Sequence, residues 1–370
     1  MNKKIRVLAI NPGSTSTKIA LFDDYDELFT LSVSHSSDEL KNFNDIQSQL
    51  EYRTKMIEKA MSEKGFLMED VDVFSGRGGG LVSVDGGVFE ISDLVTEHAS
   101  IGMSGQHPAQ LAPQIAKKYA EKFGKRAVIV NPPSVDEFID EARVSGLKGI
   151  YRESHIHALN QKEIALRYCA AHNLKYDKVN LIICHLGGGI SVTAHNNGKM
   201  IDSNDIIKGA GPMTPTRSGD LPYIGVIELA FSGDYTKKEL VDRLNKNGGL
   251  TDHFGTPEIR DVLKMMDNGD KYAEIVLGGM IYQISKYIGS MSVALKGNVD
   301  AIILTGGISN STLITDRIKE YIGWISKVKI MPGEFELEAL AAGAVRVMRG
   351  EESLQEYTGL PVWSGFQCDR

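Results

Sequence analysis

A short polar turn near the start of the chain holds the first residues that could do chemistry. Apolar runs at residues 5–10 and 19–22 flank Asn11-Pro12-Gly13 and a cluster of four hydroxyls and one ammonium at residues 14–18. Pro fixes φ and Gly tolerates φ > 0, so the segment predicts a strand, a tight turn and a second strand. The backbone N–H groups of such a turn can form a nest for an anion, and hydroxyls and Lys18 can bind phosphate oxygens. The pattern indicates an anion cradle, although an ordinary polar hairpin turn has the same composition.

The same pattern returns in the middle of the chain. Residues 181–194 contain an apolar run, the glycines Gly187–Gly189 and a second apolar run, with His185 just before the glycines. A chain whose two halves each contain such a hairpin suggests two duplicated domains that face each other across a cleft.

A third glycine turn follows the apolar run at residues 301–305. Gly306 and Gly307 lie between this predicted strand and a predicted helix that starts near residue 312. A strand–glycine–helix turn suits a nucleotide, because N–H groups at the start of a helix can face phosphate. Glycines that pack a helix on a strand are the alternative. The chain has no GxxxxGK[ST] sequence, so any ATP site does not use a P-loop.

Basic side chains and histidines occur at the ends of predicted elements. In open α/β sheets, ligands bind at the carboxyl ends of strands. The candidates are Arg77 after a strand at 72–74, His107 in the first turn of a helix at 106–123, His157 in the first turn of a helix at 155–171, and Arg217 in a loop at 209–220. A solvated arginine and a capping histidine are the plain alternatives at these positions.

Length and composition restrict the class of protein. A chain of 370 residues suggests two domains, which we place at residues 1–150 and 151–350, with a tail at about 350–370 that packs on the first. The formal net charge of −7 argues against binding to nucleic acid or to an anionic membrane. The apolar runs are too short to span a bilayer, and residues 1–4 lead directly into a strand without a signal-peptide pattern.

The cysteines Cys169, Cys184 and Cys368 show no CxxC spacing, and their odd number indicates free thiols in a reducing compartment. We therefore expect a cytoplasmic protein. Apolar periodicity predicts further helices at residues 45–64, 135–142, 270–296 and 335–349, and further strands at 127–130 and 327–331.

Five ordered blocks resemble the acetate and butyrate kinase family, the acetokinases, within the sugar kinase/Hsp70/actin superfamily. They are residues 11–18, 184–189, 215–220, 304–308 and 332–341, and they span nearly the whole chain. Residues 76–79 and 157–162 are similar to the butyrate kinase branch rather than to acetate kinases.

The resemblance implies an α/β fold of two duplicated actin-like ATPase (ribonuclease H-like) domains with a central cleft for ATP and a carboxylic acid. It also implies a reversible reaction, in which a short-chain carboxylate and ATP give an acyl phosphate and ADP, and Mg²⁺ as a cofactor. Relatives are dimers or larger, so we expect a homo-oligomer that binds neither nucleic acid nor a membrane.

The resemblance also implies roles for individual residues. The catalytic group is Arg77, His107, His157 and Arg217. The nucleotide contacts are Ser14, Ser16, Lys18, His185, Gly187, Gly188, Gly189, Gly306, Gly307 and Asn310. Asn11 and Glu336 would hold Mg²⁺, with Glu338 as the competing register.

One position departs from the family pattern. Relatives usually carry Asp where this chain has Asn131, so either Asn131 supplies hydrogen bonds alone or Asp136 takes the place of the carboxylate.

Acyl-chain length depends on pocket volume. The resemblance places Ile156 where acetate kinases carry a bulky aromatic, and Gly78–Gly80 leave room near Arg77, so both favour a chain longer than acetyl. Butyrate is the first expectation, followed by isobutyrate or another branched acid. An acetate or propionate kinase, a sugar or polyol kinase and a non-enzymatic nucleotide switch are the alternatives.

Overall fold

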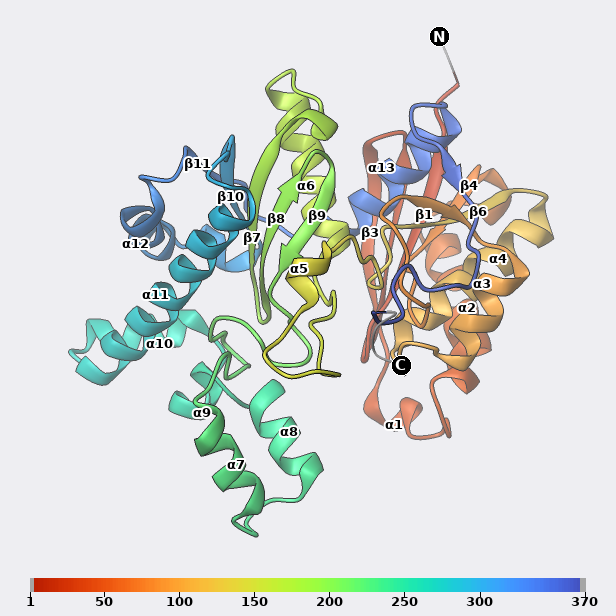
Figure 1. Ribbon diagram of the computed structural model, residues 1–370. Helices are drawn as coiled ribbons and strands as arrows, with labels where there is room; N and C mark the ends of the chain where they lie inside the picture. The colour runs from red at the N-terminus through yellow and green to blue at the C-terminus, as the bar shows by residue number, and fades with distance from the viewer. Residues whose placement is uncertain (1–2, 367–370) are drawn as a thin grey trace. The chain divides into compact units, whose positions relative to one another are not determined.

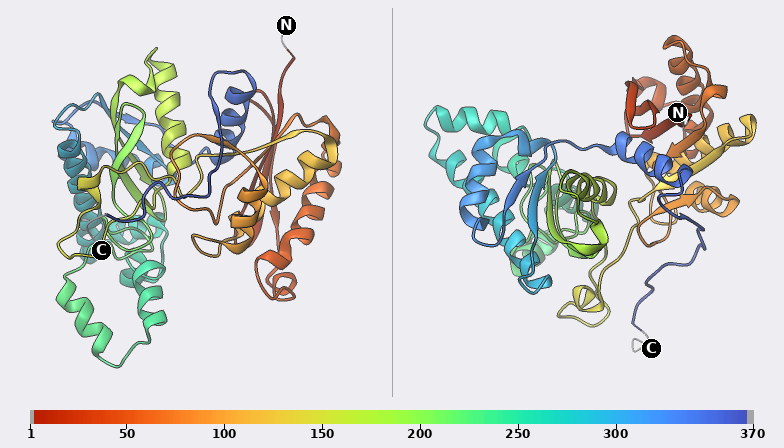
Figure 2. Two further views of the ribbon diagram at one scale, coloured as in Figure 1. Left: turned by 45° about the vertical axis from the view of Figure 1, so that its right-hand side comes forward. Right: turned by 90° about the horizontal axis from the view of Figure 1, so that it is seen from above.

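The computed structural model describes residues 3–366 and divides the chain into two compact units. Unit 1 comprises Met1–Asp136, Ala158–Glu163 and Phe335–Arg370, and unit 2 comprises Glu137–His157 and Ile164–Glu334. The chain therefore passes between the units several times. In Figure 2 the blue C-terminal helix α13 (Glu336–Met348) lies among the red and orange elements of unit 1. The residue Cys368 lies outside the described residues.

Unit 1 is built on a seven-stranded mixed sheet with the order β12-β5-β6-β4-β1-β2-β3 (Figure 1). β1 and β2 pair antiparallel, as do β2 and β3, whereas β4 runs parallel to β1. The strands are β1 (Arg6–Pro12), β2 (Ser16–Asp23), β3 (Asp26–Ser34), β4 (Val73–Gly76), β5 (Val88–Glu90), β6 (Arg126–Val130) and β12 (Leu354–Gln355).

Helices cover both faces of this sheet, because successive residues of a strand point to opposite faces. In β4, Val73 joins the apolar cluster under α13, whereas the next residue, Phe74, packs its ring 5.4 Å from that of Tyr119 in α4. The helices of unit 1 are α1 (Ser37–Leu40), α2 (Leu50–Glu63), α3 (Asp93–Ile101), α4 (Leu111–Phe123) and α13, with short 3₁₀ turns at Gln47–Gln49 (η1), Met68–Asp70 (η2) and Pro108–Gln110 (η3).

Unit 2 contains a five-stranded sheet with the order β11-β10-β7-β8-β9. Its strands are β7 (Asn180–Leu186), β8 (Ile190–Asn196), β9 (Lys199–Ser203), β10 (Ala301–Thr305) and β11 (Val328–Ile330). β7, β8 and β9 form an antiparallel meander, and β10 lies parallel to β7. The order matches β6-β4-β1-β2-β3 of unit 1 strand for strand. The expected α/β class and the duplicated sheet are thus confirmed.

The long helix α11 (Lys271–Ala294) packs its inner face on the sheet of unit 2. Asp270 caps its start by accepting from the N–H groups of Tyr272 and Ala273. Its buried residues, among them Leu277, Ile281 and Ile284, form one cluster with Ile182 and Leu304 of the sheet. The other helices assigned to this half of the fold are α5 (Asp140–Arg143), α6 (Ala158–Ala171, which begins in unit 1), α7 (Tyr223–Phe231), α8 (Lys237–Asn245), α9 (Leu250–Phe254), α10 (Ile259–Asp267) and α12 (Thr312–Ile322), with η4 (Tyr176–Lys178) and η5 (Gly307–Asn310).

The helix expected at residues 135–142 is wrong for most of its length. Val135 forms a parallel bridge with Val84, and only the single turn α5 is helical. The N–H of Ile139 donates to the carbonyl of Ile201 at 3.1 Å, so this stretch satisfies its backbone by pairing outside the helix. No helix within residues 3–366 has the length and apolar character needed to cross a membrane.

Candidate active site

The first group of candidate residues lies on the β1–β2 hairpin of unit 1. The turn closes through the N–H of Gly13, which donates to the carbonyl of Ser16 at 2.7 Å. The side chains of Ser14 and Lys18 are exposed and Ser16 is half-buried. Asn11 precedes the turn in β1, opposite Lys18 in the strand register. The hairpin thus presents hydroxyls and an ammonium at the end of the sheet where β4 also ends.

Glu336 brings together residues from three parts of unit 1. The amide Nδ2 of Asn11 donates to Glu336 Oε2 at 2.8 Å, and Nη1 of Arg77 forms an ion pair with Glu336 Oε1. Arg77 follows β4, which runs parallel to β1, so Asn11 and Arg77 emerge at the same edge of the sheet. Glu336 is in the first turn of α13, where the positive end of the helix dipole favours a carboxylate. The side chain of Glu338 makes no hydrogen bond within residues 3–366.

His107 caps the 3₁₀ turn η3. Its Nδ1 accepts from the N–H of Ala109 at 3.1 Å, and Gln110 closes the capping box by accepting from the N–H of His107 at 3.1 Å. Because Nδ1 is an acceptor, the proton of the neutral ring is on Nε2. The ring reaches solvent, yet desolvation by the surrounding protein, followed by the charges of Arg77 and Arg53, lowers the pKa of His107. His107 is therefore a neutral hydrogen-bond donor near pH 7.

His157 and His185 form the second group, which lies in unit 2. Their rings stack with centroids 4.0 Å apart and an interplanar angle of 22°. His157 Nδ1 is 2.9 Å from Ser191 Oγ, and Ser191 pairs with His185 in the β7–β8 register. His157 precedes α6 without a capping hydrogen bond from its side chain. The ring is thus held by the hairpin rather than used to start the helix.

Arg217 lies in a loop that is fastened to the glycine turn of β7–β8. Thr214 Oγ1 donates to the carbonyl of Gly188 at 2.7 Å and accepts from the N–H of Arg217 at 3.0 Å. A Cβ atom on Gly189 would lie 3.4 Å from Cζ of Arg217, so the guanidinium rests against a position without a side chain. Thr214 therefore ties the arginine loop to a proposed nucleotide turn.

The guanidinium of Arg217 is not satisfied by the protein. Its Nε and Nη1 atoms are buried and have no hydrogen-bond partner within residues 3–366. Burial lowers the pKa of Arg217, but an arginine stays protonated at neutral pH. A buried donor without a partner costs free energy, so this geometry favours an anionic ligand that accepts from both atoms.

The glycines after β10 lie at the same sheet edge as those after β7. Thr305 and His185 are paired in the parallel register of these strands. Gly306 has φ +86°, and a Cβ atom there would lie 2.4 Å from the carbonyl oxygen of Leu186, so only glycine fits. Gly307 and Asn310 are exposed in η5, where Asn310 Nδ2 donates to the carbonyl of Gly307 at 3.0 Å. The two glycine turns are neighbours, as a bound nucleotide would require.

Asn131 forms hydrogen bonds with the protein backbone. Its Oδ1 accepts from the N–H of Gly87, and its own N–H donates to the carbonyl of Gly87, both at 2.8 Å. Its φ of +38° is one that Asn tolerates better than most residues. Asp136 is buried after the bridge at Val135. Asn131 thus forms two hydrogen bonds with the backbone of Gly87, and the choice between Asn131 and Asp136 as replacement for the carboxylate stays a prediction.

The expectation that Gly78–Gly80 leave room near Arg77 is wrong. A Cβ atom on Gly79 would lie 2.6 Å from the backbone N of Gln110, and one on Gly78 would lie 2.9 Å from Cβ of Pro132. These glycines allow close packing of backbone against backbone and do not enlarge a pocket.

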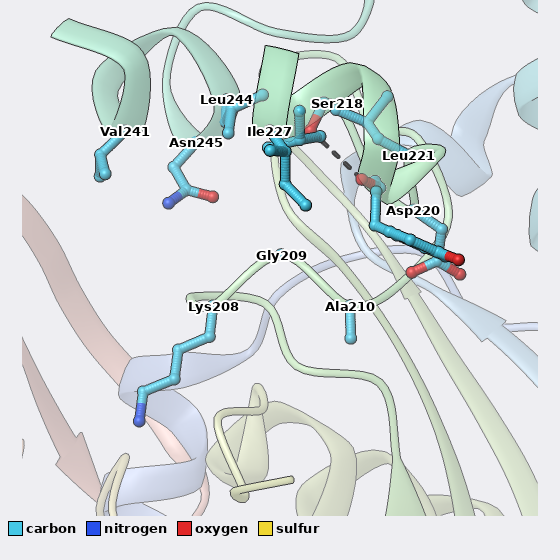
Figure 3. Close-up of a pocket in the computed structure, with 13 residues that line it drawn as sticks. Lys208, Gly209, Ala210, Ser218, Asp220, Leu221, Ile227, Val241, Leu244 and Asn245 are labelled. Carbon is cyan, nitrogen blue, oxygen red and sulfur yellow. Dashed lines mark hydrogen bonds between the residues drawn. The ribbon is translucent and has the colours of Figure 1, made fainter. Parts of the chain in front are cut away.

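Sequence reasoning missed a cavity of about 510 Å³ in unit 2 (Figure 3). It lies beside the Arg217 loop and is bounded by the loop at Lys208–Ala210, by Asp220 and by the helices α7 and α8. Figure 3 shows apolar side chains such as Leu221, Ile227 and Val241 around it, together with the amide of Asn245. The apolar run at residues 221–231 was the available signal.

Comparison with known proteins gives a consistent result. The model of the Acetokinase family matches residues 148–330. "Butyrate kinase 2" of Clostridium acetobutylicum is 42% identical over 354 residues, which are 96% of this chain and 99% of that protein. A "Probable butyrate kinase" of Clostridium botulinum is 40% identical over 95% of this chain and 99% of that protein.

Solved structures show the same fold at lower sequence identity. The acetate kinase of Porphyromonas gingivalis has a TM-score of 0.76 at 19% identity and covers 93% of this chain and all (100%) of its own. A propionate kinase of Francisella tularensis has a TM-score of 0.70 at 18% identity over 92% of this chain and 98% of its own.

Proposed function

The chain belongs to the acetokinase family, and from this premise we propose that it phosphorylates butyrate with ATP, reversibly, to give butyryl phosphate and ADP. Membership of this kinase family implies the use of ATP. The observation that carries the choice of acid is the 42% identity to a butyrate kinase over 96% of the chain. Isobutyrate or another short branched acid is the next choice.

The reaction needs positioning and charge stabilisation more than proton transfer. A carboxylate is already ionised at pH 7 and can attack the γ-phosphorus directly. The new bond joins a carboxylate oxygen to phosphorus, and the bond from phosphorus to the β,γ-bridging oxygen breaks, so that ADP leaves with the electron pair. The enzyme must bring two anions together and stabilise charge on the transferring phosphoryl group.

We propose four side chains as the stabilising donors. Arg217 is the strongest candidate, because its Nε and Nη1 are buried without a partner in the described chain. Arg77, His107 and His157 supply further donors, and arginine suits the task because its planar fork grips carboxylate and phosphoryl oxygens.

We propose that three segments bind nucleotide phosphates: the β1–β2 hairpin and the glycine turns after β7 and β10. The proposed contacts are Ser14, Ser16, Lys18, His185, Gly187, Gly188, Gly189, Gly306, Gly307 and Asn310. Their support is the exposure of Lys18 and Ser14 and the shared sheet edge of the glycine turns after β7 and β10.

Asn11 and Glu336 fit a magnesium site of few protein ligands. Within residues 3–366 no three His, Cys, Asp or Glu residues group as metal ligands. One carboxylate with a neighbouring amide suits Mg²⁺, which keeps waters and binds substrate phosphates rather than a full protein cage. When bound, the ion neutralises charge on the phosphate oxygens. The contacts of Glu336 with Asn11 and Arg77 favour it over Glu338.

We also propose that two copies of the chain associate through the outer face of α11. Tyr272, Ile275, Tyr282 and Val293 are 50% or more exposed on this face. These four residues lie three, seven and eleven residues apart along the helix. When Gly279 and Lys286 are included, the steps are three, four, three, four and seven, a heptad pattern typical of a helix that packs on another helix. Within the chain, Cβ atoms on Gly278 and Gly279 would meet nothing within 4 Å, so a second helix has room to approach.

Release of ADP that depends on an added acid tests the proposed function. ADP release with butyrate and not with sugars or polyols supports it. Release with sugars alone would indicate a sugar kinase. Slow release that no acid or sugar accelerates would indicate a nucleotide switch.

A further inference from the structure

Arg53 of α2 is a fully buried arginine (0% exposed) directly behind the β1–β2 hairpin. We propose that it is a positioning residue, which holds this hairpin in its phosphate-binding conformation and supplies it with a buried positive charge. The inference rests on the proposed function, because it assumes that the hairpin binds nucleotide phosphates.

The guanidinium binds three carbonyls of the hairpin turn. Nη1 donates to Gly13 O at 2.9 Å and to Ser16 O at 3.2 Å, and Nη2 donates to Ser14 O at 3.3 Å. Nη1 also lies 3.0 Å from Thr17 Oγ1 in β2. Residues at both ends of the turn thus share one rigid donor.

Gln49 holds the other side of the guanidinium. Its Oε1 accepts from Arg53 Nε at 3.0 Å and from Nη2 at 2.9 Å. Each nitrogen of Arg53 therefore has an acceptor, which offsets the cost of burying the charge. Lysine could not replace this network, because a single ammonium cannot reach acceptors that lie on several sides of a planar fork.

The orientation of these carbonyls decides where the turn's N–H groups point. In a trans peptide the C=O and the following N–H point in opposite directions. Because the carbonyls of Gly13 and Ser14 point to Arg53, the N–H groups of Ser14 and Thr15 point away from it. Two successive N–H groups that point the same way form a nest for an anion. Arg53 thus fixes the arrangement that makes the turn an anion site.

The charge of Arg53 acts in the same direction. No carboxylate lies within ion-pair distance of it in residues 3–366, and burial lowers its pKa without removing the proton at neutral pH. A buried charge is screened less than an exposed one, so it attracts an anion on the hairpin. Phosphate binding therefore gains from Arg53 although the side chain does not touch the ligand.

The test uses Arg53→Lys, the milder Gln49→Met and the matched control Gln47→Met. Gln47 lies in the same 3₁₀ turn η1 but pairs with Gln114, and within residues 3–366 it makes no hydrogen bond with Arg53. For each variant, folding is checked by circular dichroism, KM is measured for ATP and for butyrate, and calorimetry gives Kd for ADP and for adenosine.

We expect Arg53→Lys to raise KM for ATP and Kd for ADP about tenfold, the effect of about one lost hydrogen bond to a charged group. Gln49→Met should shift both by a smaller factor in the same direction. Kd for adenosine and KM for butyrate should stay within about twofold, as should all values of Gln47→Met. A merely structural defect would instead reduce the active fraction and leave the ratio of ADP to adenosine affinity unchanged.

Measurements on the wild-type protein distinguish a failure of the proposed function from a failure of the inference about Arg53. Wild type that forms no acyl phosphate with any acid rejects the proposed function, whatever Arg53 does. Active wild type, together with folded Arg53→Lys and Gln49→Met variants that keep the wild-type KM for ATP and Kd for ADP, overturns the inference. If Arg53→Lys does not fold, Gln49→Met decides.

Discussion

Arg77 and Glu336 form an ion pair although 259 residues separate them in the sequence. The pair joins the end of β4 to the first turn of α13, and the amide of Asn11 binds the second oxygen of the same carboxylate. Within unit 1, the carboxylate of Glu336 in the last helix therefore contacts a residue of the first strand and a residue that follows β4. This relationship explains why a segment near the C-terminus can act with the first hairpin.

Replacement of this carboxylate should weaken the proposed magnesium site. Glu336→Gln should lower kcat at least about tenfold and raise the Mg²⁺ concentration needed for half-maximal rate, because a charged ligand and the partner of Arg77 are lost together. Glu338→Gln is the matched control and should remain near wild type. Titration of activity with MgCl₂ measures both, and equal Mg²⁺ dependence in the two variants would reject the assignment of Glu336.

The unpartnered guanidinium of Arg217 gives the second prediction. Arg217→Ala should lower kcat by about 10²-fold and raise KM for the acid far less, because donors aimed at developing charge act mainly in the transition state. Steady-state kinetics with butyrate measures the split. Arg243→Ala, which removes a half-buried arginine paired with Asp252, serves as the control. An unchanged kcat in Arg217→Ala contradicts the proposed role.

The third prediction concerns acid stability and His35, which follows β3. His35 is buried between Thr17, whose Oγ1 is 2.8 Å from Nε2, and Tyr52 of α2, whose hydroxyl is 3.3 Å from Nδ1. Burial, and next the charge of Arg53, lower the pKa of His35 to about 4, whereas Glu39 after β3 opposes the shift. The unfolded chain therefore binds a proton at about pH 6.5 that the folded chain does not accept until about pH 4.

Stability should accordingly fall as the pH is lowered from about 6.5 to 4, with a contribution from His35 of at most about 3 kcal/mol. Denaturant unfolding at a series of pH values measures this slope. His35→Gln should flatten the slope, and His253→Gln, at an exposed histidine, should leave it unchanged. A slope that is the same in His35→Gln and wild type would show that His35 is not the titrating group.

The fourth prediction tests self-association. Tyr282→Glu places a charge in the centre of the exposed face of α11 and should shift the protein to a smaller species in sedimentation or light-scattering measurements. Tyr25→Glu, at a tyrosine that is 55% exposed in unit 1, is the control and should leave the mass unchanged. A mass that is unaffected by Tyr282→Glu would remove α11 as the interface.

Local sequence was sufficient to predict the repeated hairpins and the glycine turns. Each consists of apolar residues next to glycine. This pattern involves only residues that are neighbours in the sequence, so it can be recognised without knowledge of tertiary contacts. The long helix α11 was predicted for the same reason, although the sequence could not show that its face at Tyr282 is exposed. The prediction of a helix at residues 135–142 was wrong, because the bridge of Val135 with Val84 is a tertiary contact that sequence periodicity does not reveal.

Local sequence patterns could not predict the contacts that position the candidate site residues. The link from Thr214 to Gly188 and the ion pair of Arg77 with Glu336 join segments far apart in the chain. The position of Arg53 in the sequence did indicate that it is buried. It lies three residues after Leu50 and four before Ile57, on the apolar stripe of α2. An arginine on a buried stripe indicates a network of acceptors, and here the network is the hairpin.

Capture of the acyl phosphate product tests the proposed carboxylate kinase activity most directly. Purified protein is incubated with ATP, Mg²⁺ and hydroxylamine in the presence of acetate, propionate, butyrate, isobutyrate or isovalerate, and the acyl hydroxamate formed from any acyl phosphate is measured. We expect hydroxamate formation with the highest kcat/KM for butyrate or isobutyrate and a lower value for acetate. A highest value for acetate or propionate would contradict the choice of acid, and no hydroxamate with any acid would contradict the proposed carboxylate kinase.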